Sequence, residues 1–467
     1  MSLTPPALVV SPARRTFALI SILLATLMST IDASIVNVAL PSLSTELSAP
    51  PSETVWVATA FLLAVACAVP ATSALGDQLG RRRMYLLGVP IFTLASLCCA
   101  LAPTLATLVA FRVVQGLGSA IILAVSIPLY RRLFPPEQLG QVLGFNAMTV
   151  ALGTSAGPTL GGLILNALSW PWLFLINVPV GVIAWVLAFF VLPKSHPERG
   201  DYDWQGAMLA AAAIASLLVG VRQLASPDTL WVAAVLLVAC AAFVVLFVRR
   251  ERRAVRPLIP LGLFTGLFSL TVGTAWASFL GQGVAFVALP FLFQSAYHAS
   301  PLTSALLFTP WPVVIVFVAP LAGRLADRVR PAYLALAGLI VMTVGLVMCA
   351  LLGDHPPIWL VLVSTGVCGL GFGTFQSPNN RDMMSAAPLR YSASASAVLN
   401  TNRTVGQSAG SAAVSMALVI SGAAAGSTVQ QAAAATSVLW VAVLAATAAV
   451  VLSAVKLRSQ LSATAPA

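Results

Sequence analysis

The chain has 467 residues, of which 59% are hydrophobic and 8% are charged, with a formal net charge of +11. A soluble domain carries about 25% charged residues, so the composition excludes a soluble globular protein and predicts a membrane protein. A charge of +11 favours nucleic-acid binding in a soluble protein, but its distribution along this chain has another explanation. The six cysteines and three histidines show no metal-ligand spacing, so we expect neither a metal site nor a cofactor.

Apolar stretches of about 20 residues, each long enough to cross a bilayer as a helix, follow one another along the whole chain. They predict an all-α membrane protein with fourteen transmembrane helices and no folded aqueous domain. The first stretch is too long for the core of a signal peptide and has no small-residue cleavage site, so we expect it to be retained. The predicted spans are 17–40, 54–75, 84–102, 104–130, 142–165, 170–192, 204–224, 228–248, 267–296, 302–323, 331–352, 357–377, 393–421 and 431–455.

Basic residues gather on one side of the predicted membrane. If the N-terminus is cytoplasmic, 21 of the 24 Lys and Arg residues fall in cytoplasmic segments, as the positive-inside rule requires. We therefore expect a multi-pass protein of the cell membrane, the bacterial inner or plasma membrane, with both termini in the cytoplasm. Orientation alone explains the basic cluster at 249–256, and contact with acidic lipids is an alternative. We expect a monomer in the lipid bilayer that binds no nucleic acid.

The chain repeats itself at long range. Gly116-Leu-Gly118 recurs as Gly369-Leu-Gly371, and Gly153-Thr-Ser-Ala-Gly157 recurs as Gly406-Gln-Ser-Ala-Gly410, both at an offset of 253 residues. Helices rich in Gly and Ala match by chance easily, but one offset shared by separate elements favours a duplication. Two homologous halves are typical of transporters whose substrate site lies between the repeats.

The repeat also predicts the division of the chain. It maps the second span onto the tenth, a shift of eight helices, whereas two adjoining six-helix halves would give a shift of six. Two helices are therefore inserted between the halves. We predict an N-terminal six-helix half over 1–200, a two-helix insert over 201–250 and a C-terminal six-helix half over 251–467.

Only three charged side chains lie deep inside the predicted spans, namely Asp32, Arg112 and Arg403. A charge at membrane depth costs at least about 2.5–3.5 kcal/mol, so such residues usually serve a function. Asp32 and Arg112 both lie about 12 Å below the outer surface at 1.5 Å per residue, which predicts a direct or water-bridged ion pair. Burial favours a protonated carboxyl and a neighbouring Arg favours a charged one, so Asp32 can exchange a proton. A static pair that holds two helices together is the alternative.

Three sequence motifs contain or follow these charges. The first span reads Asp32-Ala-Ser-Ile-Val-Asn37, the fourth reads Arg112-Val-Val-Gln115-Gly-Leu-Gly118, and the fifth reads Gly153-Thr-Ser-Ala-Gly157-Pro158-Thr-Leu-Gly161-Gly162. With these motifs the chain resembles the fourteen-span drug:proton antiporter branch of the major facilitator superfamily over essentially its whole length. The resemblance implies the major facilitator fold, implicates Arg112 in proton coupling and marks the fifth-span motif as an antiporter signature.

The loop after the second span and its repeat in the second half are similar to a cytoplasmic gate motif of that family. They depart from the family pattern at Ser73, Gln78 and Arg330. The resemblance implies a latch between helices at the cytoplasmic side. The predicted gate residues are Asp77, Gly80, Arg81, Asp327 and Arg328.

The fifth-span motif also has a direct physical meaning. Gly153, Gly157 and Gly161 recur every fourth residue and form one helix face without side chains. Such a face lets another helix approach closely, and Pro158 kinks the helix. Because Gly162 follows, we expect a moving interface between the two halves, with ordinary helix packing as the alternative.

Candidate substrate contacts are polar and aromatic residues of spans that we expect to line the centre. Arg403 either orients an anionic or polar substrate group or anchors to carbonyl groups of neighbouring helices. No acidic residue occurs in the last six spans, so a dication would lack a second counter-charge. Most Phe side chains in such helices pack or face lipid, which is the alternative for each aromatic. The candidates are Asn37, Gln115, Trp276, Gln282, Phe372, Phe375, Gln376, Asn400 and Arg403.

These features predict a secondary transporter that exports lipophilic or amphiphilic compounds, such as drugs and monovalent cations, by alternating access and in exchange for protons. Asp32 is the predicted proton site and Arg112 its conformational sensor. A specific metabolite or a self-made antibiotic is the alternative cargo. A non-transporting membrane receptor is a further alternative, which the duplication argues against. We expect no enzymatic activity, since no catalytic constellation lies within the spans.

Overall fold

A computed structural model of the chain describes residues 11–193, 203–224, 227–254, 258, 261–264, 266–326, 328–353, 355–386, 392–421 and 428–464. The regular secondary structure of these residues consists of helices alone, in agreement with the predicted class. The helices are α1 (Pro12–Glu46), α2 (Pro51–Thr54), α3 (Trp56–Leu79), α4 (Arg81–Ala100), α5 (Leu105–Leu133), α6 (Pro136–Ala167), α7 (Trp172–Leu175), α8 (Asn177–Val191), α9 (Trp204–Gln223), η1 (Pro227–Thr229), α10 (Leu230–Glu251), η2 (Leu261–Leu263), α11 (Gly266–Ser295), α12 (Pro301–Phe308), α13 (Pro310–Leu325), α14 (Pro331–Ala350), α15 (Ile358–Ala386), α16 (Ser392–Ile420) and α17 (Thr428–Thr464).

Thirteen helical segments of the described chain are long and apolar enough to cross a membrane. They coincide with thirteen of the fourteen predicted spans. Some of these segments are not single helices. The segment from Pro301 to Leu325 breaks into α12 and α13 at Thr309, because the following Pro310 has no backbone N–H to continue the hydrogen-bond pattern.

The remaining predicted span, 393–421, corresponds to α16. This helix is 29 residues long, but it is not among the thirteen apolar segments. Its mean hydropathy is low because Ser, Thr, Asn and Gln residues, together with Arg403, run along it. α16 packs against α3, α9, α11 and α17, so neighbouring helices cover polar groups that would be costly in contact with lipid.

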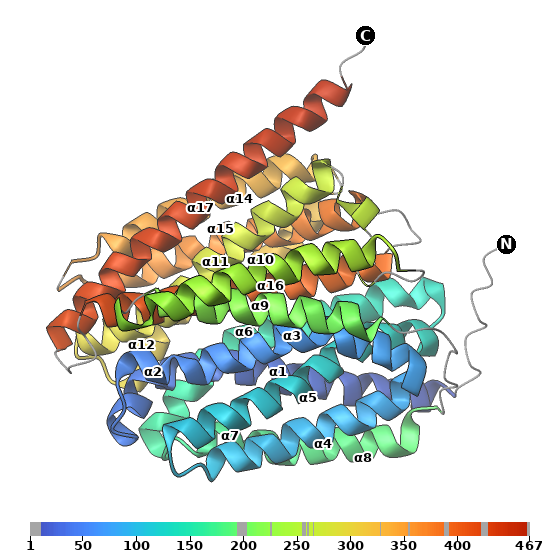
Figure 1. Ribbon diagram of the computed structural model, residues 1–467, viewed down its shortest axis with the longest axis horizontal. Helices are drawn as coiled ribbons and strands as arrows, with labels where there is room; N and C mark the ends of the chain where they lie inside the picture. Colours follow the sequence, from blue (N-terminus) through green and yellow to red (C-terminus); the bar gives the residue numbers. More distant parts are fainter. Residues whose placement is uncertain are drawn as a thin grey trace.

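The long helices lie side by side and alternate in direction, so that α1 begins and α17 ends at the same end of the bundle (Figure 1). We call this the terminal end and the opposite one the far end. α1, α3, α4, α5, α6 and α8 form one set of mutually packed helices, and α11 to α17 form a second. α9 and α10 pack on each other, and α9 contacts both α3 of the first set and α16 of the second. The α9–α10 pair therefore lies beside the junction of the two sets.

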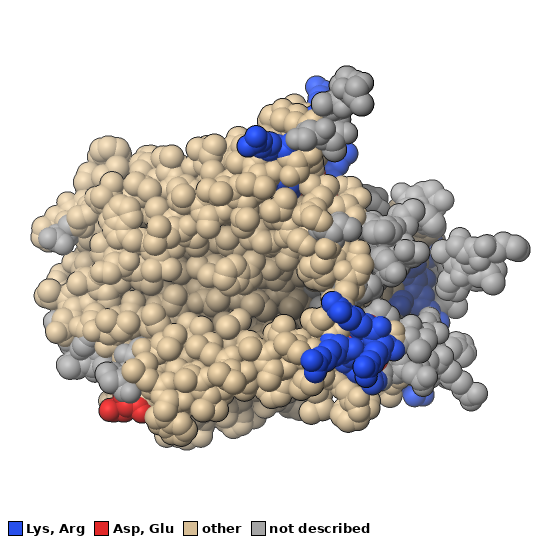
Figure 2. Space-filling model, turned by 45° about the horizontal axis from the view of Figure 1, so that its top comes forward, with Lys and Arg blue, Asp and Glu red and all other residues tan. Residues whose placement is uncertain are grey.

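Basic side chains gather at the terminal end of the bundle, which is on the right in Figure 2. Among them are Arg81 to Arg83 at the start of α4 and Arg249 and Arg250 at the end of α10. The long flanks between the two ends are almost free of charged side chains in this view. On this face an apolar belt separates the two ends, and the positive charge lies at the terminal end.

The two helix sets share a hydrophobic core only toward the far end. There the largest cluster of buried residues joins Ile35 to Leu43 of α1 with Ala275 to Phe293 of α11. Toward the terminal end, a second cluster belongs to the first set alone, around Tyr85, Phe92 and Tyr130. The described part of the second set has a small cluster of its own there, around Phe268 and Met383.

Among the described residues, four hydrogen bonds also join the second set to the first set and to the short α2 near the far end. Gln294 of α11 donates to the carbonyl of Val38 at 2.9 Å, and Ser415 of α16 donates to the carbonyl of Ser52 at 2.6 Å. Two pairs of hydroxyl groups also form hydrogen bonds, Thr59 with Ser411 at 2.9 Å and Thr159 with Thr309 at 2.8 Å. The far end is therefore held together by polar contacts as well as by a common apolar core.

The glycine stripe of α6 packs against α1, which corrects the expectation that it lies between the two halves. A Cβ atom on Gly153 would lie 2.0 Å from the Thr30 hydroxyl, and one on Gly157 would lie 1.9 Å from the Ser34 hydroxyl. The Ser34 hydroxyl donates to the carbonyl of Gly153 at 3.2 Å. Glycine spacing predicts a close approach but does not identify the partner, and here the partner is a helix of the same half.

The rest of the motif is divided between the two sets. Gly161 meets Ile35 of α1 in the same way as the other stripe glycines. Only Gly162 faces the second set, where an added Cβ would lie 2.5 Å from Ala305 of α12. Pro158 is buried inside α6 between these contacts. The stripe therefore fixes α1 on α6, and its last residue meets the other half.

Gly157→Ala is expected to destabilise the protein by about 1–3 kcal/mol, because the added methyl group overpacks the α1–α6 contact at Ser34. Gly262→Ala is the control, since nothing lies within 4 Å of a Cβ at that position. The measurement is thermal unfolding of the purified variants in detergent. Ser34→Gly in the Gly157→Ala background should restore part of the lost stability. A Gly157→Ala protein as stable as wild type would contradict this packing.

Candidate functional site

Asp32 of α1 and Arg112 of α5 are fully buried and in direct contact. Arg112 donates from Nη1 to Asp32 Oδ2, so the pair needs no bridging water. The two charges therefore meet at the common depth that the sequence indicates. Each provides the partner without which the other would carry an uncompensated charge in the interior, a situation that costs about 3–5 kcal/mol.

Amide groups saturate the second oxygen of the Asp32 carboxylate. Gln115 Nε2 and Asn177 Nδ2 each donate to Asp32 Oδ1 at 2.8 Å. The same two nitrogens donate to Ser96 Oγ at 2.5 Å and 3.3 Å. All four side chains are buried. The carboxylate is thus held by three donors from α5 and α8, with Ser96 of α4 supporting two of them.

Arg112 fastens the cluster to a further helix. Its Nε donates to the Val57 carbonyl at the start of α3 at 2.8 Å, and its Nη1 also donates to Gln115 Oε1 at 2.6 Å. The guanidinium lies 4.2 Å from the ring centroid of Phe61 and 5.7 Å from that of Phe174, within reach of cation–π attraction. Nη2 is buried without a hydrogen-bond partner. One donor of Arg112 therefore remains unused in this conformation.

Two members of this cluster, Asn177 and Ser96, are absent from the sequence predictions. Asn177 carried a usable signal, since it is a lone amide in the apolar segment that runs from Leu173 to Val191. Ser96 carried none, because small hydroxyl residues are common in membrane helices and satisfy their own hydrogen bonds locally. Gln115 was a candidate substrate contact, but the structure places it inside the ion-pair cluster.

The remaining substrate candidates do not share one environment. Phe372 and Phe375 are buried in the core of the second set, where Phe279 packs edge-on against Phe372 at 5.8 Å. Asn37 is buried, and buried Gln282 accepts a hydrogen bond from Gln407 at 2.9 Å. These residues do not bound an accessible space in this conformation. The accessible candidates are Trp276, which is 38% exposed, and the half-buried Gln376, Asn400 and Arg403.

The predicted gate is only partly described by the structure. Gly80 joins α3 to α4 with a φ of 91°, a conformation that glycine adopts without strain. Arg81 follows it and donates to the Pro128 carbonyl at 3.4 Å. Arg328 is exposed at the terminal end. Asp327 and the side chain of Asp77 lie outside the described residues.

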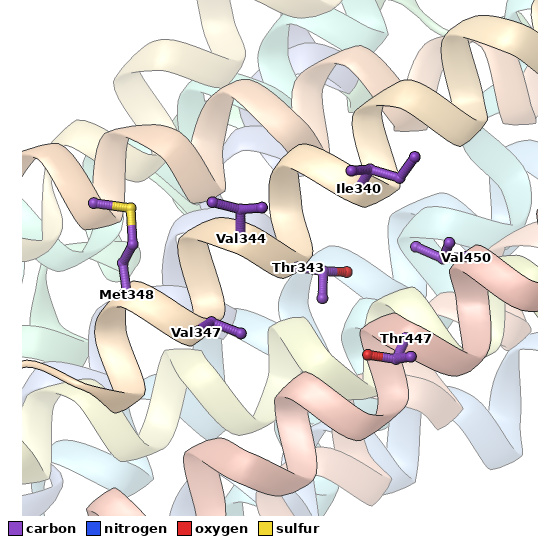
Figure 3. Close-up of a pocket in the computed structure, with 7 residues that line it drawn as sticks. All are labelled: Ile340, Thr343, Val344, Val347, Met348, Thr447 and Val450. Carbon is purple, nitrogen blue, oxygen red and sulfur yellow. The ribbon is translucent and has the colours of Figure 1, made fainter.

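A groove of about 300 Å³ lies between α14 and α17 (Figure 3). The hydroxyl groups of its two threonines, Thr343 and Thr447, each donate to a carbonyl of their own helix at 2.8 Å. The groove therefore presents hydrocarbon, as expected for a surface that lipid covers, and we assign no site to it. Within the described chain, no three His, Cys, Asp or Glu side chains lie close enough to hold a metal ion.

The family model for the Major Facilitator Superfamily matches residues 22–411. The chain belongs to this superfamily. Its fold, with many apolar helices in two packed sets, is that of a multi-pass membrane transporter. The family consists typically of transporters rather than enzymes. The predicted major facilitator fold is therefore confirmed.

Relatives of similar length carry several names. The chain is 39% identical to the "Uncharacterized transporter YebQ" of Escherichia coli, with 86% of this chain and 88% of that protein covered. It is 31% identical to the "Riboflavin transporter RibZ" of Clostridioides difficile, over 84% and 86% of the two chains. It is 32% identical to the "Multidrug resistance protein Stp" of Mycobacterium tuberculosis, over 83% and 73%.

Solved structures share the fold at low sequence identity. A bacterial homologue of the human lysosomal transporter Spinster, in an inward-facing and unoccupied conformation, has a TM-score of 0.68 and 16% identity, with 98% of this chain and all of that one covered. A POT family transporter in complex with a thioalcohol-conjugated peptide has a TM-score of 0.69 and 14% identity, over 96% of each chain. These similarities concern the fold alone.

Asn177→Ala is expected to destabilise the protein by about 1–3 kcal/mol, because it removes one of the donors that saturate the buried Asp32 carboxylate. Asn177→Asp should be more damaging, since it places a second carboxyl group beside the first. Thermal unfolding of the purified variants measures both effects. Asn146→Ala, which removes an amide bonded to Tyr130 at 3.2 Å, is the control. If Asn177→Asp were no worse than Asn177→Ala, the contact with Asp32 would be wrong.

Proposed function

We propose that this transporter exports lipophilic or amphiphilic compounds in exchange for protons, with Asp32 as the proton site and Arg112 as its conformational sensor. The observation that carries the proposal is the buried cluster in which a single carboxylate is held by one arginine and two amides. Relatives named "Multidrug resistance protein Stp" and "Drug efflux pump JefA" support export of foreign compounds.

The cluster is linked through the backbone to the contacts between the two helix sets. Arg112 holds the carbonyl of Val57, and Thr59, two residues further along α3, bonds to Ser411 of α16. Asp32 lies six residues before Val38, whose carbonyl accepts the hydrogen bond from Gln294. A change in the ion pair therefore affects α1 and α3, two helices that close the far end.

Proton uptake is the change that we propose. A protonated Asp32 no longer attracts Arg112 as an ion, so the guanidinium can exchange its contacts and use the idle Nη2 donor. Opening of the far end to release the compound breaks the Thr59–Ser411 contact and, through the start of α3, loosens Arg112, so that Asp32 takes up its proton from the far side. The far end then closes with the proton bound, the proton leaves toward the terminal end, and the ion pair forms again. Arg112 itself stays charged throughout the cycle.

The orientation of the cycle follows from charge. We propose that the terminal end, where the basic side chains gather, faces the cytoplasm of a bacterial cell, as the positive-inside rule requires. The far end then faces outward, and protons reach Asp32 from that side down their gradient. The gate residues Asp77, Gly80, Arg81, Asp327 and Arg328 would latch the cytoplasmic side when the far end opens.

A specific metabolite is the second candidate cargo. It is supported by the relative named "Riboflavin transporter RibZ", which is as similar to this chain as the drug-resistance proteins are. The ion-pair cluster serves either cargo equally, because it belongs to the first helix set, whereas the exposed Trp276 and the half-buried Gln376 belong to the second. A toxicity and metabolite screen of a deletion strain distinguishes the two.

Asp32→Asn is expected to abolish proton-driven transport, because the amide has the same volume but cannot exchange a proton. Uptake of a fluorescent amphiphilic dye into energised inverted vesicles, with and without a protonophore, measures the coupling. Exchange of dye across liposomes at equal pH needs no net proton movement and should persist in the variant. Asp382→Asn, in the Lys456 ion pair at the terminal end, is the control. Full proton-driven uptake by Asp32→Asn would remove Asp32 from the mechanism.

Arg112→Lys is expected to slow transport by about ten-fold or more, because an ammonium group lacks the planar fork that directs Nη1 to Asp32 and Nε to the Val57 carbonyl. Initial rates in reconstituted liposomes, normalised to the amount of folded protein, provide the measurement. Arg250→Lys, at the partly exposed ion pair with Asp203, should transport at the wild-type rate. Wild-type rates in Arg112→Lys would leave Arg112 as a packing element only.

A further inference from the structure

The polar residues of α16 form a continuous stripe. Asn400, Arg403, Gln407 and Ser411 follow one another at spacings of three or four residues, which places them on one helix face. Ser415 extends the stripe by a further turn. This stripe is the reason why α16 falls short of the apolarity of the other thirteen membrane segments.

The far-end part of the stripe is already engaged by the other helix set. Ser415 donates to the carbonyl of Ser52, and Ser411 bonds to Thr59 of α3. Gln407, one turn further toward the terminal end, bonds to Gln282 of α11. Arg403 continues the same face about 12 Å beyond Ser411 at 1.5 Å per residue. The stripe thus runs from the closed far end toward the middle of the bundle.

Arg403 is the unpaired cation of the described interior. Arg112 is paired with Asp32 and buried Lys456 with Asp382, but no hydrogen bond or ion pair joins Arg403 to any residue that the structure describes. The side chain lies near the middle of α16 and is only half-buried. A half-buried charge at membrane depth is expected where it borders a water-filled path rather than lipid.

The charge balance of the interior is therefore positive. Asp32 is the only carboxylate at membrane depth within the described segments, and its oxygens are occupied by Arg112, Gln115 and Asn177. The nearest described carboxylate along the chain of the second set is Asp382, which is held by Lys456 at the end of α15. A cationic compound would meet uncompensated positive charge, whereas an anionic compound would neutralise it.

An accessible aromatic surface lies on the neighbouring helix. The Trp276 carbonyl of α11 lies 3.0 Å from the position of a Cβ on Gly406, and Asn402 donates to the Val272 carbonyl at 3.0 Å. These contacts hold the Trp276 segment of α11 against the Arg403 segment of α16. Trp276 is 38% exposed, so an aromatic group is available on the helix segment that packs beside the Arg403 segment.

We infer that Arg403 binds an anionic group, a carboxylate or a phosphate, of the transported compound, which is therefore an amphiphilic anion with an apolar body. That this compound is transported rests on the proposed function. The planar guanidinium can donate two parallel hydrogen bonds to such a group. The same chemistry also suits a lipid headgroup or an inorganic anion, and the experiment separates these sources.

The test is equilibrium binding to the purified protein in detergent, which requires neither proton coupling nor a direction of transport. The probes are aromatic dyes of one ring system in three forms, with a carboxylate, a neutral amide or a quaternary ammonium group. Wild type should bind the carboxylate form most tightly. Arg403→Gln should weaken that binding by roughly ten- to hundred-fold, the loss of a charged hydrogen bond, and should leave the amide form unchanged. Arg403→Lys should retain an intermediate affinity.

Two controls identify the binding group and its source. Arg252→Gln removes an exposed arginine outside the spans and should bind all three dyes as wild type does. Competition with inorganic phosphate and with micelles of an anionic phospholipid shows whether either occupies the Arg403 site more tightly than the dye. Thermal unfolding verifies that Arg403→Gln is folded.

The inference would be overturned if wild type bound the ammonium form as tightly as the carboxylate form or more tightly, or if it bound none of the three dyes. It would also be overturned if the carboxylate preference survived Arg403→Gln. Displacement of the dye by lipid or phosphate at a concentration below that of the dye would overturn it as well. Failure of proton-driven transport with intact Arg403-dependent binding would reject the proposed coupling and leave this inference standing.

Discussion

The ion pair between Asp32 and Arg112 is the interaction on which the rest of the first helix set depends. Two charges removed from water are stable only when their remaining donors and acceptors are satisfied. The cluster meets this requirement by drawing on five helices, through Val57 of α3, Ser96 of α4 and Asn177 of α8 as well as on α1 and α5. The positions of these helices relative to one another are therefore fixed at the depth of a single carboxylate.

Close packing of α1 makes this arrangement sensitive to small movements. On one side, Thr30 and Ser34 sit in the space left by Gly153 and Gly157 of α6. On another, Val38 is bonded to α11 of the second set. α1 therefore cannot shift without affecting both the ion pair and the contact between the sets. A rigid helix with one titratable group is a simple way to connect protonation with the arrangement of the two halves.

The sequence predicts much of this structure because its signals are local. Each apolar stretch determines its own helix, and two lone charges at equal depth, Asp32 and Arg112, predict their own contact. What the sequence does not predict depends on three-dimensional neighbours. The stripe through Gly157 indicates a close approach of another helix but does not identify that helix as α1. Ser96 has no distinctive local pattern. The spacing of aromatic residues does not distinguish a core residue such as Phe372 from an accessible one such as Trp276.

The polarity of α16 has a consequence for how the protein is made. Membrane insertion sorts each new segment by its own apolarity, and an Arg at a helix centre costs about 2.5–3.5 kcal/mol on that scale. α16 carries Arg403 and a polar stripe, so its retention in the bilayer depends on α3, α9 and α11, which precede it, and on α17, which follows. Its insertion is therefore a cooperative step that is complete only after α17 has been synthesised. Arg403 and the polar stripe of α16 thus delay the assembly of the second helix set.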